Sequence, residues 1–312
     1  MANEIEALAD ALTGFGVDEK TLISSLGKWK EEDTRAFRNG THFFSQDERL
    51  FETWNDFHVA QLRREFLRFN TAMVLRVMHP WERDARLLKD AIMDGPKSYN
   101  VIAEVACTRS SEELLGARKA FHSLFHRSLE EDVADTVNGV ERKLLVALVS
   151  SYRYEGPKVK EATAKVEADI LHSAFTKGVG AGKSPFEDDE VVRILSTRSK
   201  VHLKTVFGFY KKISSHNIDE DLGESCLKDA VQCLDHPPTY FVKVLEAAME
   251  KGADENTKEA IPRVVTTRAH IDMKEIKDEY LNKHGISLHD KIGTIAKGNF
   301  RDFILALIVL AD

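Results

Sequence analysis

A glycine-bracketed stretch near the start of the chain, Gly14-Phe15-Gly16, has the residue types of a cation-binding turn. It follows an apolar helical pattern, so the carbonyl oxygens of the last helical turn lack partners within the helix and carry the negative end of its dipole. The two glycines allow the backbone to fold so that several of these oxygens converge. Ca²⁺ takes about six to eight oxygen ligands, so a carboxylate from elsewhere must complete such a site. Glu65 is a candidate, and the alternative is an ordinary helix-to-helix turn closed by a glycine.

Other chemistry has less support in the sequence. The stretch Gly178–Ser184, GVGAGKS, lacks the first glycine of a phosphate-binding loop, because Lys177 stands there, and no strand pattern precedes it. We interpret it as a flexible linker. Cys107 and Cys233 lie in apolar helical patterns, which favours buried, inert thiols. The sequence shows no serine–histidine–acid arrangement and no set of three metal-ligating histidines, so we expect no catalytic residues.

Three copies of one pattern divide the chain, each with an apolar pair, a Thr-Arg pair and further apolar positions at fixed distances. The copies are Ile102–Phe121, Val191–Tyr210 and Ile261–Tyr280. A degenerate fourth copy lies upstream and has Trp29 in place of the arginine. Arginines at one position of a repeat indicate structural ion pairs with carboxylates rather than catalysis. A repeat of this period predicts helical units that pack on their neighbours. We place the four units at residues 4–80, 85–155, 158–236 and 239–312.

The elements that must position the turn are helices. Apolar residues at helical spacing predict a helix over residues 4–13, and Asp18 is a candidate N-cap for the next helix. Residues 39–53 break the periodicity and read as an enlarged loop in the first unit. The extra residues between the second and third copies fall in 158–185, where we expect the repeats to split into two halves. No stretch alternates as a strand does, so the predicted fold class is all-α.

Composition limits the function. The chain has 312 residues and a net charge of −7, which opposes nucleic-acid binding and direct docking on an anionic lipid surface. Three cysteines, an odd and sparse set, favour a reducing compartment. The first residues lack the pattern of a signal peptide, and the longest apolar run, Phe303–Leu310, is too short to span a bilayer. We expect a soluble cytosolic protein.

The repeat centres VACTRS, ILSTRS and VTTRA resemble those of the annexin family, and RKLLVALVSSYRYEG (142–156) and HPWERDA (79–85) resemble its plant branch. The resemblance spans essentially the whole chain. It implies an all-α fold of four repeats of about five helices each, arranged as a curved disc. It also implies Ca²⁺-dependent binding to anionic phospholipid, through loops of the pattern Gly-x-Gly-Thr with a carboxylate further along the repeat.

Carried over residue by residue, the resemblance gives the first unit one metal site. Its ligands are the carbonyl oxygens of Leu12, Gly14 and Gly16 and the carboxylate of Glu65. Two departures from the family pattern are a valine directly after the loop, where threonine is usual, and a longer distance to the acid, which the insertion at 39–53 explains. Phe15, at the loop tip, is a predicted membrane contact. The alternative for its ring is a position folded back on its own unit.

The other units match the pattern less well. In the second, Asp94–Lys97 stands at the loop and Thr136 falls at the capping position, so we interpret this loop as non-functional. In the third, the glycine-rich residues are displaced and no clear capping acid follows. The fourth offers a weaker site from three residues, although Ile295 at its capping position cannot ligate a hard cation. The residues of this weaker site are Met249, Gly252 and Asp254, with Glu255 as the alternative acid.

We therefore predict a Ca²⁺-regulated protein of the cytoplasm that lies peripherally on anionic phospholipid membranes when calcium rises. Ca²⁺ is the expected cofactor, nucleic acid is not an expected partner, and self-association stays open. Three alternatives also stay open. They are a cation channel, a nucleotide-hydrolysing or peroxidase activity of the kind attributed to plant annexins, with a redox role for Cys107 and Cys233, and a Ca²⁺-independent helical scaffold.

Overall fold

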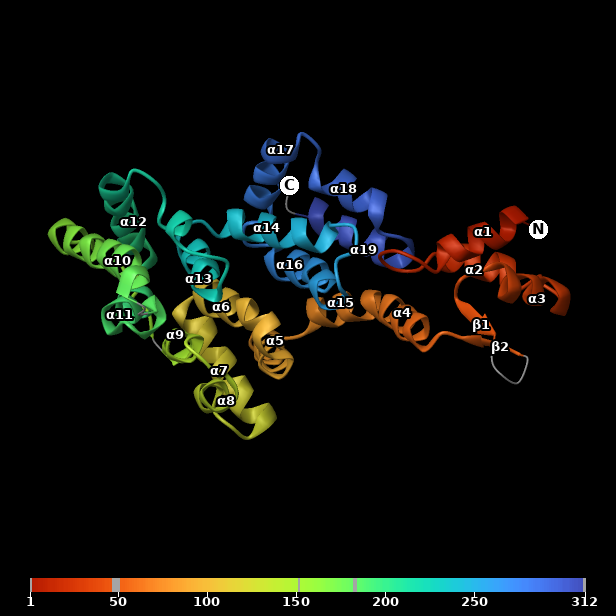
Figure 1. Ribbon diagram of the computed structural model, residues 1–312, viewed down its shortest axis with the longest axis horizontal. Coiled ribbons are helices and arrows are strands. Elements are labelled where there is room, and N and C mark those ends of the chain that lie inside the picture. The colour runs from red at the N-terminus through yellow and green to blue at the C-terminus, as the bar shows by residue number, and fades with distance from the viewer. Residues whose placement is uncertain (1, 47–50, 151, 182–183, 311–312) are drawn as a thin grey trace. The chain divides into compact units, whose positions relative to one another are not determined.

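The computed structural model describes residues 2–46, 51–150, 152–181 and 184–310, and helices make up nearly all of it (Figure 1). The chain forms two units: residues up to Val77 together with those from Phe241 onward, and residues Met78–Tyr240. The predicted split between the second and third repeats is therefore wrong. Helices of the third repeat pack on those of the second, and helices of the fourth pack on those of the first.

The first unit combines the first and fourth repeats. Its long helix α4 packs against α16 and α19, so two segments far apart in the sequence share one core. The elements of the first repeat are α1 (Ala2–Ala11), α2 (Glu19–Leu26), α3 (Glu31–Gly40), β1 (Phe44–Gln46), β2 (Glu52–Trp54) and α4 (Asp56–Val77). Those of the fourth repeat are α14 (Pro237–Met249), α15 (Glu255–Lys258), α16 (Ala260–Arg268), α17 (Met273–His284), α18 (Leu288–Ile295) and α19 (Gly298–Val309).

The second unit combines the second and third repeats, with α5 packed on α7, α10 on α12 and α13 on α6. The elements of the second repeat are α5 (Pro80–Asp94), η1 (Gly95–Ser98), α6 (Tyr99–Thr108), α7 (Ser111–Phe125), α8 (Leu129–Thr136) and α9 (Glu141–Ser150). Those of the third are α10 (Glu161–Ala181), η2 (Pro185–Glu187), α11 (Asp189–Thr197), α12 (Lys200–Ser214), η3 (Ile218–Asp221) and α13 (Cys226–Asp235).

Helix starts follow the capping residues of the sequence. The carboxylate of Asp18 accepts a hydrogen bond from the amide of Thr21 at 3.2 Å, which confirms the predicted N-cap of α2. Ser110 caps α7 in the same way, at 3.2 Å from the amide of Glu113. Pro80 occupies the first turn of α5, where its missing amide hydrogen costs nothing. These caps fix where the loops between helices begin and end.

The insertion in the first repeat is not a plain loop. It forms a short antiparallel hairpin in which Phe44 pairs with Trp54, and the two rings lie 4.4 Å apart between centroids. Phe37 and Phe43, both buried, continue this aromatic cluster into the core of the first repeat. The expectation of no strands at all is therefore wrong here, because aromatic side chains, which favour strands, hold the two short segments together.

Helix α10 corrects the interpretation of the glycine-rich stretch. It runs to Ala181, so Gly178–Ala181 is helical and is not the flexible linker that the sequence predicts. Gly182 and Lys183, which complete the GVGAGKS stretch, lie outside the described residues. A helix before the lysine differs from the strand and loop that a phosphate-binding motif requires.

The arginines of the repeat make the predicted structural ion pairs. Arg109 lies 2.7 Å from the carboxylate of Asp84, and both side chains are buried. Arg198 approaches Glu167 at 2.6 Å, and Arg268 approaches Asp272 at 2.7 Å. Each pair ties the end of the second helix of its repeat to a neighbouring segment, so the arginines hold the repeat together.

No helix within the described residues is both long enough and apolar enough to cross a membrane.

Candidate metal site

The glycine turn of the first repeat and the predicted capping acid meet in the structure. The amide of Gly16 donates a hydrogen bond to Oε2 of Glu65 at 2.6 Å, although 49 residues separate them. Helix α4 supplies Glu65, whose side chain is 5% exposed. Gly14 and Gly16 have φ angles of 103° and 78°, which side chains with a Cβ rarely adopt. The long insertion therefore does not displace the acid from the turn.

The carbonyl oxygens of the turn divide into two groups. That of Ala11 accepts a hydrogen bond from Asp18, and that of Phe15 accepts one from Lys297 at 2.7 Å. Those of Leu12, Thr13, Gly14 and Gly16 accept none from any residue that the structure describes. Apart from that of Thr13, these are the carbonyl groups that the sequence assigns to a metal site.

A cavity of about 240 Å³ adjoins the turn. Leu12, Thr13 and Gly14 line one part of it and Glu65 another, so the turn and the acid border a common space. Glu255 and Lys258 from the fourth repeat and aromatic residues around the hairpin complete the lining. Oxygen donors of this kind, main-chain carbonyls with one carboxylate, fit a hard cation such as Ca²⁺.

The carboxylate of Glu65 has a second partner, the guanidinium of Arg68. The two groups form a bidentate pair, with Nε of Arg68 at 3.0 Å from Oε2 and Nη2 at 2.9 Å from Oε1. Arg68 is fully buried and also contacts Glu255 and Glu259, each at 2.8 Å. Burial opposes its positive charge, but the hydrogen bond to Glu65 and the three nearby carboxylates outweigh burial and raise the pKa of Arg68. We call Arg68, Glu65, Glu255 and Glu259 the Arg68 cluster.

The predicted membrane contact requires Phe15 to lie at the surface, but it does not. Its side chain is 7% exposed, and it occupies the alternative position, folded back on its own unit. The guanidinium carbon of Arg68 lies 5.5 Å from the ring centroid, and Nζ of Lys258 lies 5.3 Å from it. Two cations on the electron-rich ring and the bond from Lys297 to its main chain hold the residue inward.

The weaker loop of the fourth repeat stays a prediction. Gly252 has a φ of 95° with open space around it, and Met249 is buried. The carboxylate of Asp254 accepts a hydrogen bond from the amide of Thr257 at 2.8 Å, so it serves as the N-cap of α15. The next acid, Glu255, faces Arg68 and Lys258.

The loops of the second unit offer less. Asp135, beside the capping position of the second repeat, contacts Arg127 at 3.2 Å. In the third repeat the glycine-rich residues are part of α10. Among the described residues, no three His, Cys, Asp or Glu side chains gather as a metal site built from side chains would require.

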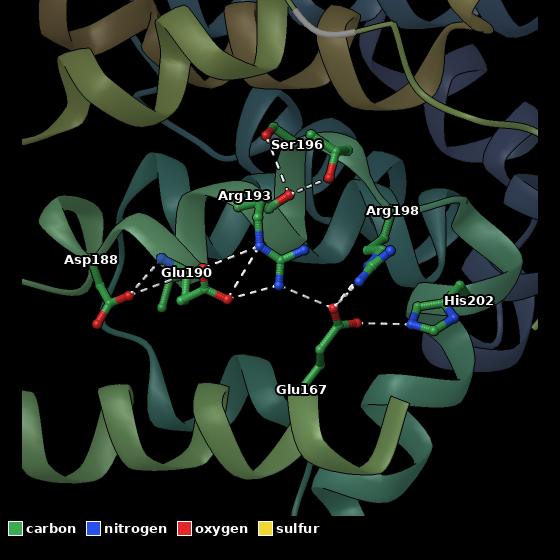
Figure 2. A network of polar contacts seen from close by, with 9 residues as sticks. Glu167, Asp188, Glu190, Arg193, Ser196, Arg198 and His202 are labelled. Carbon is green, nitrogen blue, oxygen red and sulfur yellow. Dashed lines mark hydrogen bonds and ion pairs between the residues drawn. The ribbon is translucent and has the colours of Figure 1, made fainter. Parts of the chain in front are cut away.

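Glu167, on α10, is the centre of a different buried network (Figure 2). Figure 2 shows its carboxylate between the side chains of Arg193, Arg198 and His202. Its oxygens lie 3.2 Å from Arg193, 2.6 Å from Arg198 and 2.8 Å from Nε2 of His202. Burial raises the pKa of Glu167, but the hydrogen bonds from Arg198, His202 and Arg193 outweigh it and lower the pKa. We call these four residues the Glu167 network.

The three cysteines of the sequence are buried and form no disulfide. Burial raises the pKa of Cys107 to about 11 and also raises that of Cys226. A thiol of high pKa has little of the reactive thiolate form at neutral pH. The structure therefore favours the inert interpretation for Cys107.

Arg68 and Glu259 are the members of this site that sequence reasoning missed. Arg68 stands one helical turn after Glu65, a spacing that brings side chains together on a helix. That spacing could have indicated the ion pair. The contact with the fourth repeat could not be found from the first repeat alone.

A family model described as Annexin matches residues 83–148, 167–233 and 240–307, which are the cores of the second, third and fourth repeats. Annexin D4 of Arabidopsis thaliana is 50% identical to this chain, over 99% of the chain and 98% of that relative. The chain belongs to the annexin family. Its similarity to a plant annexin runs through the first repeat as well, although the family model does not match there.

Solved annexin structures have the same fold as this annexin. Chicken annexin V superposes with a TM-score of 0.68 at 27% identity, over 98% of this chain and 94% of that one. The structure of calcium-bound annexin (Sm)1 superposes with a TM-score of 0.65, over 98% of this chain and 90% of that one, and its 18% identity shows the fold alone. The annexin fold and the plant resemblance that the sequence predicts are confirmed.

Proposed function

We propose that this annexin binds anionic phospholipid membranes in a Ca²⁺-dependent way, through the turn of its first repeat. The observation that carries the proposal is the position of Glu65, which lies within hydrogen-bonding distance of the turn whose carbonyl oxygens at Leu12 and Gly14 have no donor among the described residues. Membership of the annexin family, whose resemblance implies Ca²⁺-dependent binding to phospholipid, supports the choice of ion.

The chain's own residues would do three things at this site. The carbonyl groups of Leu12, Gly14 and Gly16 would hold one side of the ion, and Glu65 would supply the single negative charge. Gly16 also keeps the turn close to the fourth repeat, because a Cβ at this position would lie 2.8 Å from the carbonyl oxygen of Lys297. Bound Ca²⁺ would supply the positive charge and the open coordination positions that phosphate oxygens of a lipid headgroup take.

Charge explains why such binding would depend on the ion. The chain carries a net charge of −7, which repels an anionic membrane surface. A site with one carboxylate belongs to the weak end of protein calcium sites, with a Kd of roughly 10⁻⁴–10⁻³ M without lipid. Lipid that completes the coordination raises the apparent Ca²⁺ affinity, and Ca²⁺ raises the lipid affinity by the same factor.

Co-sedimentation with vesicles tests the proposal. We expect the protein to pellet with phosphatidylserine vesicles only when Ca²⁺ is present and to return to the supernatant when a chelator is added. Glu65→Gln should remove this response, because it removes the carboxylate that contacts the turn directly. The matched control is Glu131→Gln, which removes an exposed acid of the second repeat. Pelleting of the Glu65→Gln variant at wild-type Ca²⁺ concentrations would overturn the assignment of the site.

A further inference from the structure

The cation that already contacts Glu65 is the most unusual feature of the first repeat. Arg68 is fully buried, and its three nitrogens contact carboxylates on two repeats: Glu65 on α4, Glu255 on α15 and Glu259 at the start of α16. Both oxygens of Glu65 are engaged with it. The one acid of the turn is thus neutralised by a positive charge of the chain itself.

Comparison of the repeats shows that this position is special. The residues at the capping position in the second and fourth repeats are Thr136 and Ile295, and three residues after each comes a glycine, Gly139 or Gly298. Both glycines have positive φ angles, 92° and 58°; Gly139 lies between α8 and α9, and Gly298 begins α19. In the first repeat, Arg68 stands three residues after Glu65, and α4 runs through it as one helix.

An arginine in place of the glycine of the other two repeats acts directly on the neighbouring acid. A continuous helix places residues three apart on one face, so the guanidinium lies directly beside the carboxylate. A glycine there would supply no charge and would leave the acid of the turn without an internal counter-ion.

We infer that Arg68 is a built-in competitor for the calcium site and sets the Ca²⁺ concentration at which the turn is loaded. This inference rests on the proposed function of the turn. Without Ca²⁺, Glu65 pairs with Arg68. When Ca²⁺ binds, the carboxylate of Glu65 coordinates the ion, and Arg68 keeps Glu255 and Glu259 as partners.

The remaining acids make this exchange physically reasonable. A buried guanidinium that lost its only carboxylate would be strongly destabilised. Arg68 has two further partners at 2.8 Å, so it stays neutralised when Glu65 turns away. Lys258 shares Glu255 with it, at 2.8 Å from the other carboxylate oxygen, which limits the negative charge in the cluster. The competition therefore weakens Ca²⁺ binding without preventing it.

The test is a Ca²⁺ titration of thermal unfolding, followed by circular dichroism on the full chain without lipid. The variant Arg68→Met removes the charge and keeps an unbranched side chain. We expect a lower Tm than wild type in chelator, since Glu65 loses its counter-ion. We also expect a larger rise of Tm with Ca²⁺, and the rise should begin at about tenfold lower Ca²⁺ than in wild type.

Three further variants make the result specific. Arg63→Met removes an exposed arginine of the same helix and should behave as wild type. Arg68→Lys keeps the charge without the bidentate geometry and should need an intermediate Ca²⁺ concentration, which provides a second variant if Arg68→Met does not fold. The double variant Arg68→Met with Glu65→Gln should show no Ca²⁺-dependent rise.

The outcomes separate the inference from the proposed function. A folded Arg68 variant that needs the same or a higher Ca²⁺ concentration than wild type, while the wild-type response still depends on Glu65, would overturn the inference alone. Absence of any Glu65-dependent rise in wild type and in both Arg68 variants would overturn the proposed function together with it. A wild-type response that becomes more sensitive in both variants, in the order lysine then methionine, would support both.

Discussion

The Arg68 cluster and the Glu167 network are ion-pair groups, each built around one buried charged residue, and they have opposite charge ratios. In the Arg68 cluster, one guanidinium is shared by three carboxylates. One of these acids, Glu65, borders the turn whose carbonyl oxygens accept no hydrogen bond from the described residues. In the second, one carboxylate is shared by two arginines and a histidine. A group with more acids than bases can accept a further cation, and a group with more bases than acids cannot. Under the proposed function, the sign of the surplus charge, rather than burial and ion pairing alone, distinguishes the calcium site from the Glu167 network.

The largest effect on stability is expected in the Glu167 network. Glu167→Gln leaves the buried His202 and two arginines without their shared carboxylate, and should cost about 2 to 3 kcal/mol of unfolding free energy. This is below the value for a fully buried pair, since Arg193 and Arg198 are more than one-third exposed. Urea unfolding should give the same loss with and without Ca²⁺. The matched control, Glu190→Gln, changes an exposed acid that also pairs with Arg193 but lies outside the network.

Glu65→Gln should cost less and respond differently. It removes one charged partner from Arg68, which keeps Glu255 and Glu259, so we expect a loss of about 1 to 2 kcal/mol in chelator. Added Ca²⁺ should stabilise wild type and leave this variant unchanged, as measured by urea unfolding. Equal stabilisation of wild type and Glu65→Gln by Ca²⁺ would mean that the ion binds elsewhere and that the Arg68 cluster does not differ from the Glu167 network in this respect.

The two groups should also differ in the sign of their pH dependence. The lowered pKa of Glu167 contributes stability that is present above its ordinary value of about 4.5 and is lost as pH falls through the folded-state value. Burial raises the pKa of Glu259 more than Arg68 lowers it. Protonated Glu259 therefore contributes to folding stability below about pH 4.5, and this contribution is lost as pH rises through the folded-state pKa. Urea unfolding from about pH 3 to 7 should show a weaker acid-side loss in Glu167→Gln than in wild type. In Glu259→Gln, the decline towards neutral pH should be weaker.

The smallest effect is expected at the exposed edge of the Glu167 network. Arg193→Ala removes one of two arginines that share Glu167, and its side chain is 39% exposed. We expect a loss of below about 1 kcal/mol, because solvent screens exposed pairs. Thermal or urea unfolding is sufficient to measure it. A loss as large as that of Glu167→Gln would mean that Arg193, rather than Arg198 and His202, provides the essential partner.

The repeat pattern explains how much of this was accessible from the sequence. The spacing of Arg109, Arg198 and Arg268 predicts the repeats and their structural ion pairs, since local helical periodicity and a repeated position carry that information. The turn at Gly14–Gly16 was predicted from glycines that follow a helical pattern, and its acid from the family resemblance; the structure brings the two together. The pairing of the first repeat with the fourth was not predictable, because no local pattern records which repeats share a core.

The orientation of side chains also could not be predicted from the sequence. Phe15 looks exposed in the sequence because it lies between two glycines at a loop tip. In the structure, Arg68 and Lys258 lie over its ring and hold it inward, and Lys258 comes from the fourth repeat. The hairpin at Phe44–Gln46 and Glu52–Trp54 was missed because three-residue strands are too short to show alternation.

The role of Glu65 in membrane binding is best tested by calorimetric titration of Ca²⁺ into wild type and into Glu65→Gln, each with and without phosphatidylserine vesicles. For wild type we expect weak Ca²⁺ binding without lipid and clearly tighter binding with lipid, and for Glu65→Gln we expect loss of the lipid-enhanced binding. Indistinguishable titrations of the two proteins in the presence of vesicles would contradict this role.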